Sequence, residues 1–412
     1  MGGSSYNGAD ACPEYMSNLG AVRVAAPHSP HAEQQTHIGI NAHLLSGEAG
    51  YRRAGIHQYV YQVLRHLPAT AGRRYTVYTR QPAAADDPPN QRRRATPLPT
   101  ERRLARIVWE QAVWPYAARR DRLDLLHSMA FAMPRLVPCP AVVTIYDLSF
   151  VHYPDSFPTL QRRYLERVTA DSCRRARRLI AISESGRQDV HRVYGVPLER
   201  IDVVVPGVAV AYRPLPPEEV AAFRRRLDLP ERFLLHVGTL QPRKNVPLLL
   251  DALARLGRDD APLVLVGGKG WLYDAIFARV AALGLERRVR FAGYVDDDDL
   301  PLWYNAAAAL VLPSRYEGFG LPIVEALACG TPVVAANASS LPEAGGAAAL
   351  YFAPDDDAAL AACLADVLDR PEVAARARIE GPAQAGRFSW ARAGQETAAV
   401  YDRALAAPEG PR

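Results

Sequence analysis

From Thr36 onward, short apolar segments of strand length alternate with longer segments of helical periodicity, and this alternation restricts the fold more than any other feature. In the first half the pattern predicts strands at Ile38–Ala42, Tyr75–Thr79, Leu123–His127, Ala141–Ile145, Arg178–Ile182 and Ile201–Val205. Helices are predicted between them, most clearly at Ile56–Leu67 and Thr159–Arg177. Such alternation favours a parallel sheet covered by helices on both faces.

The alternation stops at Gly207–Pro217, a proline-rich stretch without periodicity that we interpret as an interdomain linker. A second set of strands is predicted at Phe233–Val237, Leu263–Val266, Val289–Ala292, Leu310–Leu312, Pro332–Ala335 and Leu350–Phe352. We therefore expect an α/β protein with two doubly wound, Rossmann-like domains facing a cleft, where the carboxyl ends of both sets of strands bind ligands. Residues 81–100, rich in Pro, Arg and Asp, are predicted to form a mobile loop.

The stretch Ser314–Glu325 joins a buried-type strand to a helix. Gly318 and Gly320 let the backbone come close to a ligand, and Pro322 suits the first turn of a helix. Unpaired N–H groups and the positive end of the helix dipole then make an anion site. Glu317 and Glu325 can reach the same ligand from different depths. The alternative is that they only cap the helix and match its dipole.

Several further motifs can be recognised in the chain: Glu317-Gly-Phe-Gly-Leu-Pro-Ile-Val-Glu325 with its continuation to Val334, His236-Val-Gly-Thr-Leu-Gln-Pro-Arg-Lys-Asn245, Leu263-Val-Leu-Val-Gly-Gly268, Gly293-Tyr-Val295, Ser339-Ser-Leu-Pro-Glu343 and Phe388-Ser-Trp390. Over roughly residues 37–406 these motifs and their order closely resemble the retaining, nucleotide-sugar-dependent glycosyltransferases of family four. The resemblance implies a GT-B fold. It also implies transfer of a hexose, with the mannose type favoured, from a nucleotide-diphosphate sugar to a glycan or lipid-linked acceptor in polysaccharide or glycoconjugate biosynthesis.

The resemblance and the composition together suggest four segments. Residues 1–36 are expected to be a disordered extension, 37–212 an acceptor-side domain, and 213–387 the nucleotide-sugar domain. Residues 388–412 are expected to form a terminal helix that crosses back onto the first domain.

Arg243 and Lys244 follow a predicted strand and precede a helix, so both charges can face the cleft. A departing diphosphate needs preorganised cations, and in the family this basic pair contacts the donor phosphates. On residue type alone a solvated loop pair is the alternative. Family members often carry an arginine where this chain has Thr239, so Arg243 is expected to supply the guanidinium contact.

The remaining donor contacts are carried over from the family motifs. Glu317 is expected to contact the transferred sugar and Glu325 the ribose hydroxyls, while backbone groups of Val295 hold the base. The backbone after Glu317 is expected to hold sugar hydroxyls and phosphate, through Gly318, Phe319, Gly320 and Leu321.

In the first domain, Tyr146-Asp147 stands where family members commonly have His-Asp. Asp147 can orient a hydroxyl or cap the end of its strand. The loop Gly50–Ile56, with Gly55, resembles the family's first glycine loop, which approaches the diphosphate and the acceptor. Ser183-Glu-Ser185 also matches a family position, and a helix N-cap is the better interpretation of Ser183.

The net charge of +5 comes with arginine clusters in the first half at 92–94, 102–103, 119–120 and 174–178. Such clusters are usually solvated helix faces, and the alternative is a basic surface for anionic lipid headgroups or a charged acceptor. Without a repeat of aromatic and basic residues or a helix that reads bases, we expect no nucleic-acid partner.

The five cysteines are scattered without metal-ligand spacing, which fits a reducing compartment. No apolar run is long enough for a spanning helix, and Met1–Gln35 lacks the pattern of a signal peptide. We expect a cytoplasmic protein, peripheral at most to the inner face of the membrane.

Asp296–Asp299 suits a helix start better than a metal site, so no metal and no cofactor beyond the donor are expected.

Two other functions are compatible with this architecture. A nucleotide-sugar epimerase would need its own acid and base carboxylates and would consume no acceptor. A scaffold without catalysis would be expected to lack the charged motif residues, and all of them are present.

Overall fold

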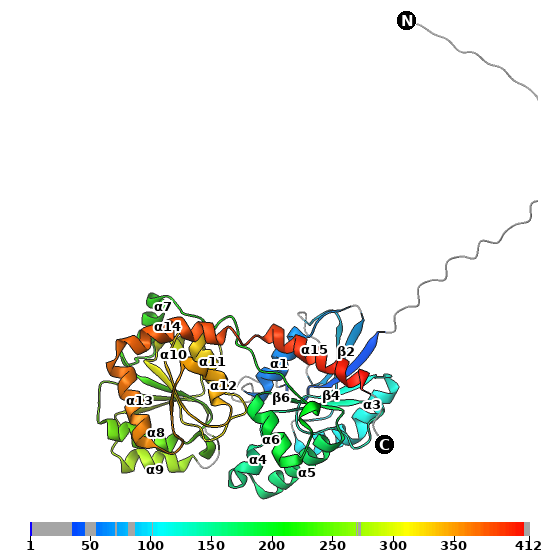
Figure 1. Ribbon diagram of the computed structural model, residues 1–412, viewed down its shortest axis with the longest axis horizontal. Coiled ribbons are helices and arrows are strands. Elements are labelled where there is room, and N and C mark those ends of the chain that lie inside the picture. Colours follow the sequence, from blue (N-terminus) through cyan, green and yellow to red (C-terminus); the bar gives the residue numbers. More distant parts are fainter. Residues whose placement is uncertain are drawn as a thin grey trace, which may run out of the picture. The chain divides into compact units, whose positions relative to one another are not determined.

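The structure is a computed structural model that describes Met1 and residues 35–407, except residues 46–54, 71, 81–86, 101, 269, 271 and 272. Two sheets organise it, and every strand pairing within them is parallel (Figure 1). The first sheet contains β1 Thr36–Asn41, β2 Arg73–Thr79, β3 Gln91–Ala95, β4 Leu125–Ser128, β5 Ala141–Ile145, β6 Arg178–Ala181 and β7 Ile201–Val203. The second contains β8 Leu234–Val237, β9 Leu263–Val266, β10 Val289–Gly293, β11 Ala309–Leu312, β12 Val333–Ala336 and β13 Leu350–Phe352.

Both sheets are doubly wound, which confirms the expected fold class. The strand order is β3-β2-β1-β4-β5-β6-β7 in the first and β10-β9-β8-β11-β12-β13 in the second. In each sheet the chain starts in the middle, winds to one edge, and returns to wind to the other. The direction of winding therefore reverses between β1 and β4 and between β8 and β11. Ligands of open α/β sheets bind at such reversal points, outside the carboxyl ends of the strands.

Helices flank both sheets (Figure 1). In the first half they are α1 Ile56–His66, α2 Arg103–Val108, the π-helical segment Trp109–Val113, α3 Trp114–Arg120, α4 Ser149–His152, α5 Thr159–Arg175 and α6 Glu184–Tyr194. In the second half they are α7 Pro217–Arg226, α8 Val246–Leu256, α9 Asp274–Ala282, α10 Leu300–Ala306, α11 Leu321–Ala328, α12 Leu341–Gly345, α13 Asp357–Asp369, α14 Pro371–Ala385 and α15 Trp390–Ala406. Among the helices of the described residues, none is both long enough and apolar enough to cross a membrane.

The central strands are apolar on both faces because helices cover both sides of each sheet. All residues of β9 and β11 are buried, and α8 presents Leu249, Leu250 and Leu253 to the same core. Continuous apolar runs of this kind made these strands easy to locate from the sequence.

The prediction of a mobile loop at residues 81–100 is wrong for its second half. Gln91–Ala95 forms β3, which pairs with β2 at the edge of the first sheet. An edge strand with an exposed face tolerates a Gln-Arg-Arg-Arg sequence, so no apolar alternation marks it. Residues 81–86, and the predicted extension at 1–36 apart from its two ends, lie outside the described residues.

The last helix, α15, packs along α1 of the first domain (Figure 1). Its Tyr401 is fully buried, and the Tyr401 hydroxyl lies 2.7 Å from Nδ1 of His127, at the end of β4. Arg403 forms an ion pair of 2.9 Å with Asp202 in β7. Helix α15 is therefore part of the first domain's core.

Candidate active site

Two neighbouring strands of the second sheet bring charged side chains to the same edge. After β8 the chain forms a short 3₁₀ turn, Pro242–Lys244, that carries Arg243 and Lys244. The loop after β11 carries Glu317. Lys244 Nζ lies 2.6 Å from Glu317 Oε1, and Arg243 Nη1 lies 2.7 Å from Glu317 Oε2. Three residues singled out separately in the sequence thus form one ion cluster.

Hydrogen bonds hold the backbone of Glu317 in place from the neighbouring loop after β12. Glu317 N–H donates to Ser339 Oγ at 2.9 Å, and Ser340 Oγ donates to the Glu317 carbonyl at 2.9 Å. Arg243 Nη1 also donates to the Tyr316 carbonyl at 2.9 Å. The Glu317 carboxylate therefore has little freedom to leave the two cations.

The ion cluster is poorly solvated, with side-chain exposure of 9% for Lys244 and Glu317 and 17% for Arg243. Burial by itself would raise the pKa of Glu317, but Arg243 and Lys244 overcome it and lower that pKa to about 2. Burial lowers the pKa of Lys244, and the Glu317 carboxylate opposes that shift. Arg243 and Lys244 share Glu317 as their ion-pair partner, and the Asp147 carboxylate acts on both cations from farther away. Because the two cations share one ion-pair partner, they can also attract a bound anion.

The start of α11 lies beside this cluster in the sequence and leaves backbone donors uncapped. Gly320 has φ of 110°, in the left-handed region that favours glycine, and it precedes the first helical residue, Leu321. No side chain caps this N-terminus. Free N–H groups and the helix dipole at this point also favour an anion.

Glu325 lies inside α11 and is half-buried. The Tyr304 hydroxyl donates a hydrogen bond of 2.7 Å to Glu325 Oε2. Burial raises the pKa of Glu325 to about 7, although the hydrogen bond from Tyr304 opposes the shift. The carboxyl group is therefore divided between its neutral and ionised forms near neutral pH.

The first domain contacts the glycine loop after β11 through the end of β5. A Cβ atom at Gly318 would lie 2.4 Å from the Tyr146 carbonyl oxygen, so only glycine permits this approach. The Tyr146 hydroxyl is turned away and donates to the Met129 carbonyl at 2.7 Å. Asp147 Oδ1 accepts hydrogen bonds from the backbone N–H and the hydroxyl of Ser149, at 2.9 and 2.7 Å. Asp147 therefore holds the turn that leads from β5 into α4.

Comparison with known proteins agrees with this geometry. Residues 53–212 match the family model "Glycosyltransferase Family 4", and residues 218–384 match "Glycosyl transferases group 1". The chain is 35% identical to the O-antigen chain mannosyltransferase B of Escherichia coli over 289 residues, which are 69% of this chain and 76% of that protein. The chain belongs to the group 1 glycosyltransferases.

Solved structures confirm the GT-B fold of this glycosyltransferase. Sucrose-phosphate synthase from Thermosynechococcus elongatus superposes with a TM-score of 0.70 at 24% identity, covering 89% of this chain and 98% of that one. Anabaena HepE, solved in complex with UDP and glucose, superposes with a TM-score of 0.67 at 20% identity, covering 89% and 99%.

The other predicted donor residues of this glycosyltransferase lie at strand and helix ends. Thr239 follows β8, and Val295 follows β10; both are half-buried. Gly55 has φ of 61° and precedes α1. Most of the glycine loop at Gly50–Ile56 lies outside the described residues.

Sequence reasoning missed the residues that bridge to the first domain. Glu343 accepts hydrogen bonds from the N–H groups of Glu184 and Ser185, at 2.8 and 2.7 Å, at the start of α6. Ser183 caps the same helix as predicted, accepting from Gly186 N–H at 3.0 Å. The motif around Glu343 was recognised, but no local pattern shows that its carboxylate reaches a helix 159 positions away in sequence.

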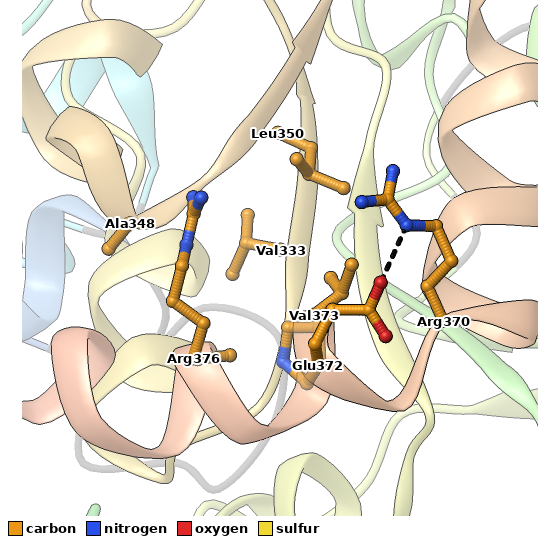
Figure 2. Close-up of a pocket in the computed structure, with 9 residues that line it drawn as sticks. Val333, Ala348, Leu350, Arg370, Glu372, Val373 and Arg376 are labelled. Carbon is orange, nitrogen blue, oxygen red and sulfur yellow. Dashed lines mark hydrogen bonds and ion pairs between the residues drawn. The ribbon is translucent and has the colours of Figure 1, made fainter.

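A cavity of about 90 Å³ lies at the opposite end of the second sheet (Figure 2). Val333 and Leu350, the first residues of β12 and β13, line it together with Arg370, Glu372 and Arg376. Arg370 Nε and Glu372 Oε1 form an ion pair of 2.9 Å beside it. Because the strands begin here, this cavity is separate from the site at their carboxyl ends.

In the acidic run at Asp296–Asp299, the structure shows an ion pair with a neighbouring helix. Asp299 forms an ion pair of 2.9 Å with Arg226 of α7. Within the part of the chain that the structure describes, no three His, Cys, Asp or Glu side chains are grouped as a metal site would require.

Proposed function

We propose that this glycosyltransferase moves a hexose from a nucleotide-diphosphate sugar to a glycan or lipid-linked acceptor, with retention of anomeric configuration and without a divalent metal. The observation that carries the proposal is the buried Glu317–Arg243–Lys244 cluster, in which two cations share one carboxylate. A nucleotide diphosphate develops negative charge as the sugar leaves, and preorganised cations stabilise that charge most in a site that excludes water.

In this proposal Arg243 and Lys244 bind the diphosphate, and the uncapped start of α11 behind Gly320 supplies further N–H donors. Glu317 then faces the transferred sugar, and its low pKa keeps it ionised, able to accept hydrogen bonds from sugar hydroxyls. Glu325 holds the ribose hydroxyls, and Tyr304 orients its carboxylate from behind. Gly318, Phe319, Leu321, Thr239, Val295 and Gly55 complete the donor site. Asp147 holds the loop after β5 facing the sugar.

Retention would follow from attack on the face of the sugar that the diphosphate leaves. The acceptor oxygen forms the new bond to the anomeric carbon while the bond from that carbon to the phosphate oxygen breaks. The departing phosphate oxygen takes the acceptor's proton, so no protein base is required. The only glutamate of this cluster is already ion-paired with two cations, which supports a role in binding rather than as a nucleophile.

The nature of the sugar rests on similarity. The Escherichia coli relative is by name an O-antigen chain mannosyltransferase, and its 35% identity over 289 residues supports a mannose-type hexose. A glycan acceptor in surface polysaccharide synthesis is the corresponding proposal for the second substrate.

The decisive experiment incubates the protein with a panel of nucleotide sugars and measures slow donor hydrolysis. We expect hydrolysis of one donor or a few, with a GDP- or UDP-linked hexose among them. Interconversion of the donor sugar without hydrolysis would indicate an epimerase. No turnover of any donor would indicate a scaffold and would contradict the proposal.

We also propose that the protein contacts the cytoplasmic face of the membrane through the helix formed by residues 103–120. Leu104, Val108 and Tyr116 on this helix are 78%, 56% and 65% exposed. In a regular α-helix, Leu104 and Tyr116 would be about 120° apart, at about 100° per residue. The wider turn of the π-helical segment at Trp109–Val113 contains about one residue more than an α-helical turn. This extra residue brings the angle between Leu104 and Tyr116 close to zero. The three side chains therefore share one face.

Arginines surround this apolar face. Arg102 and Arg103 at one end and Arg119 and Arg120 at the other are all exposed. The one acidic residue within 102–120, Glu110, is buried on the inner side. An apolar stripe between arginines fits an anionic lipid surface, because apolar groups enter the interface and guanidinium groups contact headgroups. A lipid-linked acceptor would then reach the first domain directly from the bilayer.

A further inference from the structure

A small cavity lies at the reversal point of the first sheet, where no donor residue is predicted. Three residues line it from the sheet side: Asn41, the last residue of β1, His43, which follows β1, and Phe131, which follows β4. Arg106 and Glu110 line it from the helix of residues 103–120. β1 and β4 are the neighbours between which the winding direction reverses, the place where open α/β sheets bind ligands.

The polar groups of this cavity are buried and incompletely hydrogen-bonded. Glu110 is 6% exposed, and its Oε1 accepts a long hydrogen bond of 3.5 Å from Asn41 Nδ2. That separation is beyond the usual range of such bonds. His43 is 7% exposed; its Nδ1 lies 3.0 Å from Thr100 Oγ1, and its Nε2 has no partner among the described residues. Buried polar atoms in native proteins are nearly always satisfied, so the Nε2 atom of His43 indicates a missing ligand or water.

The chemistry of the lining selects a neutral, hydroxyl-bearing ligand. Burial raises the pKa of Glu110 to about 7 and lowers that of His43 to about 3, so His43 is neutral and Glu110 is neutral or negative at neutral pH. The ionised Glu110 carboxylate would repel an anion, although Arg106 in the lining and Arg80 nearby would balance part of that charge. An apolar ligand would leave both polar groups unpaired. A hydroxyl group, which donates and accepts, can satisfy a carboxyl oxygen and an imidazole nitrogen together.

The volume of the cavity shows which parts of a ligand can enter it. The cavity measures about 60 Å³, and a cavity needs about 10–15 Å³ on this measure to hold one water molecule. Several hydroxyl-sized groups therefore fit, so the edge of a sugar that carries hydroxyl groups can enter.

The cavity is structurally connected to the proposed reaction centre. The Phe131 ring packs on the Tyr146 ring with centroids 5.8 Å apart. The Tyr146 carbonyl in turn faces Gly318, which follows Glu317 in the chain. A sugar edge held at Glu110 would thus lie on the first domain's side of the donor site.

We propose that the cavity between Glu110 and His43 binds the hydroxyl-bearing edge of a neutral acceptor sugar and selects the acceptor by that edge. The inference rests on the proposed glycosyl transfer and adds the acceptor's chemistry and the residues that recognise it. A site that hydrogen-bonds a buried hydroxyl discriminates strongly against an analogue that lacks it, because its polar groups are then left unpaired.

The test compares Glu110→Gln and His43→Gln with the exposed control Glu199→Gln, using methyl glycosides of common hexoses and their monodeoxy analogues as acceptors. We expect the ratio of transfer to donor hydrolysis to fall at least 10-fold in Glu110→Gln and His43→Gln, and to stay unchanged in the control. For wild type, transfer to one of the monodeoxy analogues should be as low as transfer to the parent glycoside is for Glu110→Gln. An unchanged ratio in the variants, including one that results from equal losses of transfer and hydrolysis, would overturn the proposal.

A second measurement separates this proposal from the proposed function. Ligand-observed NMR measures binding of the same methyl glycosides to the folded wild-type protein and to each variant, without any donor. Glycoside binding that is at least 10-fold weaker in Glu110→Gln or His43→Gln than in wild type supports the acceptor site. This holds even if the protein turns over no donor, because absent donor turnover would count against the proposed function alone. Absence of glycoside binding to wild type would show that the cavity holds only water and would overturn the inference.

Discussion

The hydroxyl group of Tyr316 donates a hydrogen bond of 2.7 Å to Asp189 Oδ2, joining the residue before Glu317 to α6 of the first domain. The same hydroxyl accepts a bond from Leu148 N–H at 2.9 Å, and His152 Nε2 lies 2.7 Å from the same Asp189 oxygen. The Tyr316 carbonyl accepts from Arg243. Tyr316 therefore connects the ion cluster of the second domain to a polar group in the first.

We expect Tyr316→Phe to lower kcat/KM about tenfold, because it leaves Leu148 N–H without its acceptor and frees the loop that positions Glu317. A buried hydrogen bond to a charged group contributes about 1.5–3 kcal/mol. Donor affinity measured by calorimetry should change less than turnover. Tyr61→Phe, which loses only a contact with Arg65, is the matched control and should retain wild-type rates. A pure loss of donor affinity would argue against a positioning role.

Glu317→Gln is expected to lower kcat at least 100-fold, about 2.7 kcal/mol in transition-state stabilisation, while the dissociation constant of the donor stays the same or falls. The reason is electrostatic: removing the carboxylate leaves Arg243 and Lys244 with two unbalanced charges for the diphosphate. Stopped-flow binding and steady-state rates measure the two effects separately. Weaker donor binding in Glu317→Gln would assign the carboxylate to donor affinity instead.

Arg243→Ala and Lys244→Ala should each lower kcat/KM by about 10²–10³, about 3–4 kcal/mol, because each removes a cation from the departing diphosphate. The control is Arg255→Ala, whose exposed side chain pairs with Asp357 on the surface. Wild-type activity should persist in EDTA, and NMR should show the anomeric configuration of the donor in the product. Activity lost in EDTA and restored by Mg²⁺ or Mn²⁺, or an inverted product, would contradict the mechanism.

Donor binding should depend on pH through Glu325. With its pKa raised to about 7, the carboxyl group is neutral below that pH and ionised above it. Only the ionised form accepts hydrogen bonds from two ribose hydroxyls with both oxygens. The donor KM should therefore fall as pH rises from 6 to 8. In Glu325→Gln the donor KM should be higher and nearly independent of pH. The same pH profile in the variant and wild type would show that another group titrates.

Binding to anionic vesicles should decrease with salt and depend on the stripe of Leu104, Val108 and Tyr116. The double change Leu104→Asn and Val108→Asn should weaken sedimentation with vesicles about tenfold or more, since a buried aliphatic side chain contributes about 1.5–3 kcal/mol. Ile379→Asn, which alters an equally exposed residue on α14, is the control. No binding of the wild type at low salt would remove the membrane proposal.

The fold class could be predicted from the sequence, because apolar periodicity is a local property that each strand carries in its own residues. Ala141–Ile145, Leu263–Val266 and Leu350–Phe352 have the predicted bounds, and the other predicted strands differ by one to a few residues. The polar edge strand Gln91–Ala95 was missed because an edge position needs no apolar pattern. Arg243, Lys244, Glu317 and Glu325 were likewise found from motifs that are contiguous in the chain.

Which of these residues are in contact depends on the tertiary structure. Glu317 and the two cations lie 73 and 74 positions apart, and Tyr316 and Asp189 lie 127 apart, so their contacts depend on how separate strands and helices pack. The raised pKa of Glu110 and the lone Nε2 of His43 arise in the same way, since burial comes from distant segments that exclude water. Periodicity specifies a backbone conformation, but the partners and the solvation of a charge are set by residues remote in sequence.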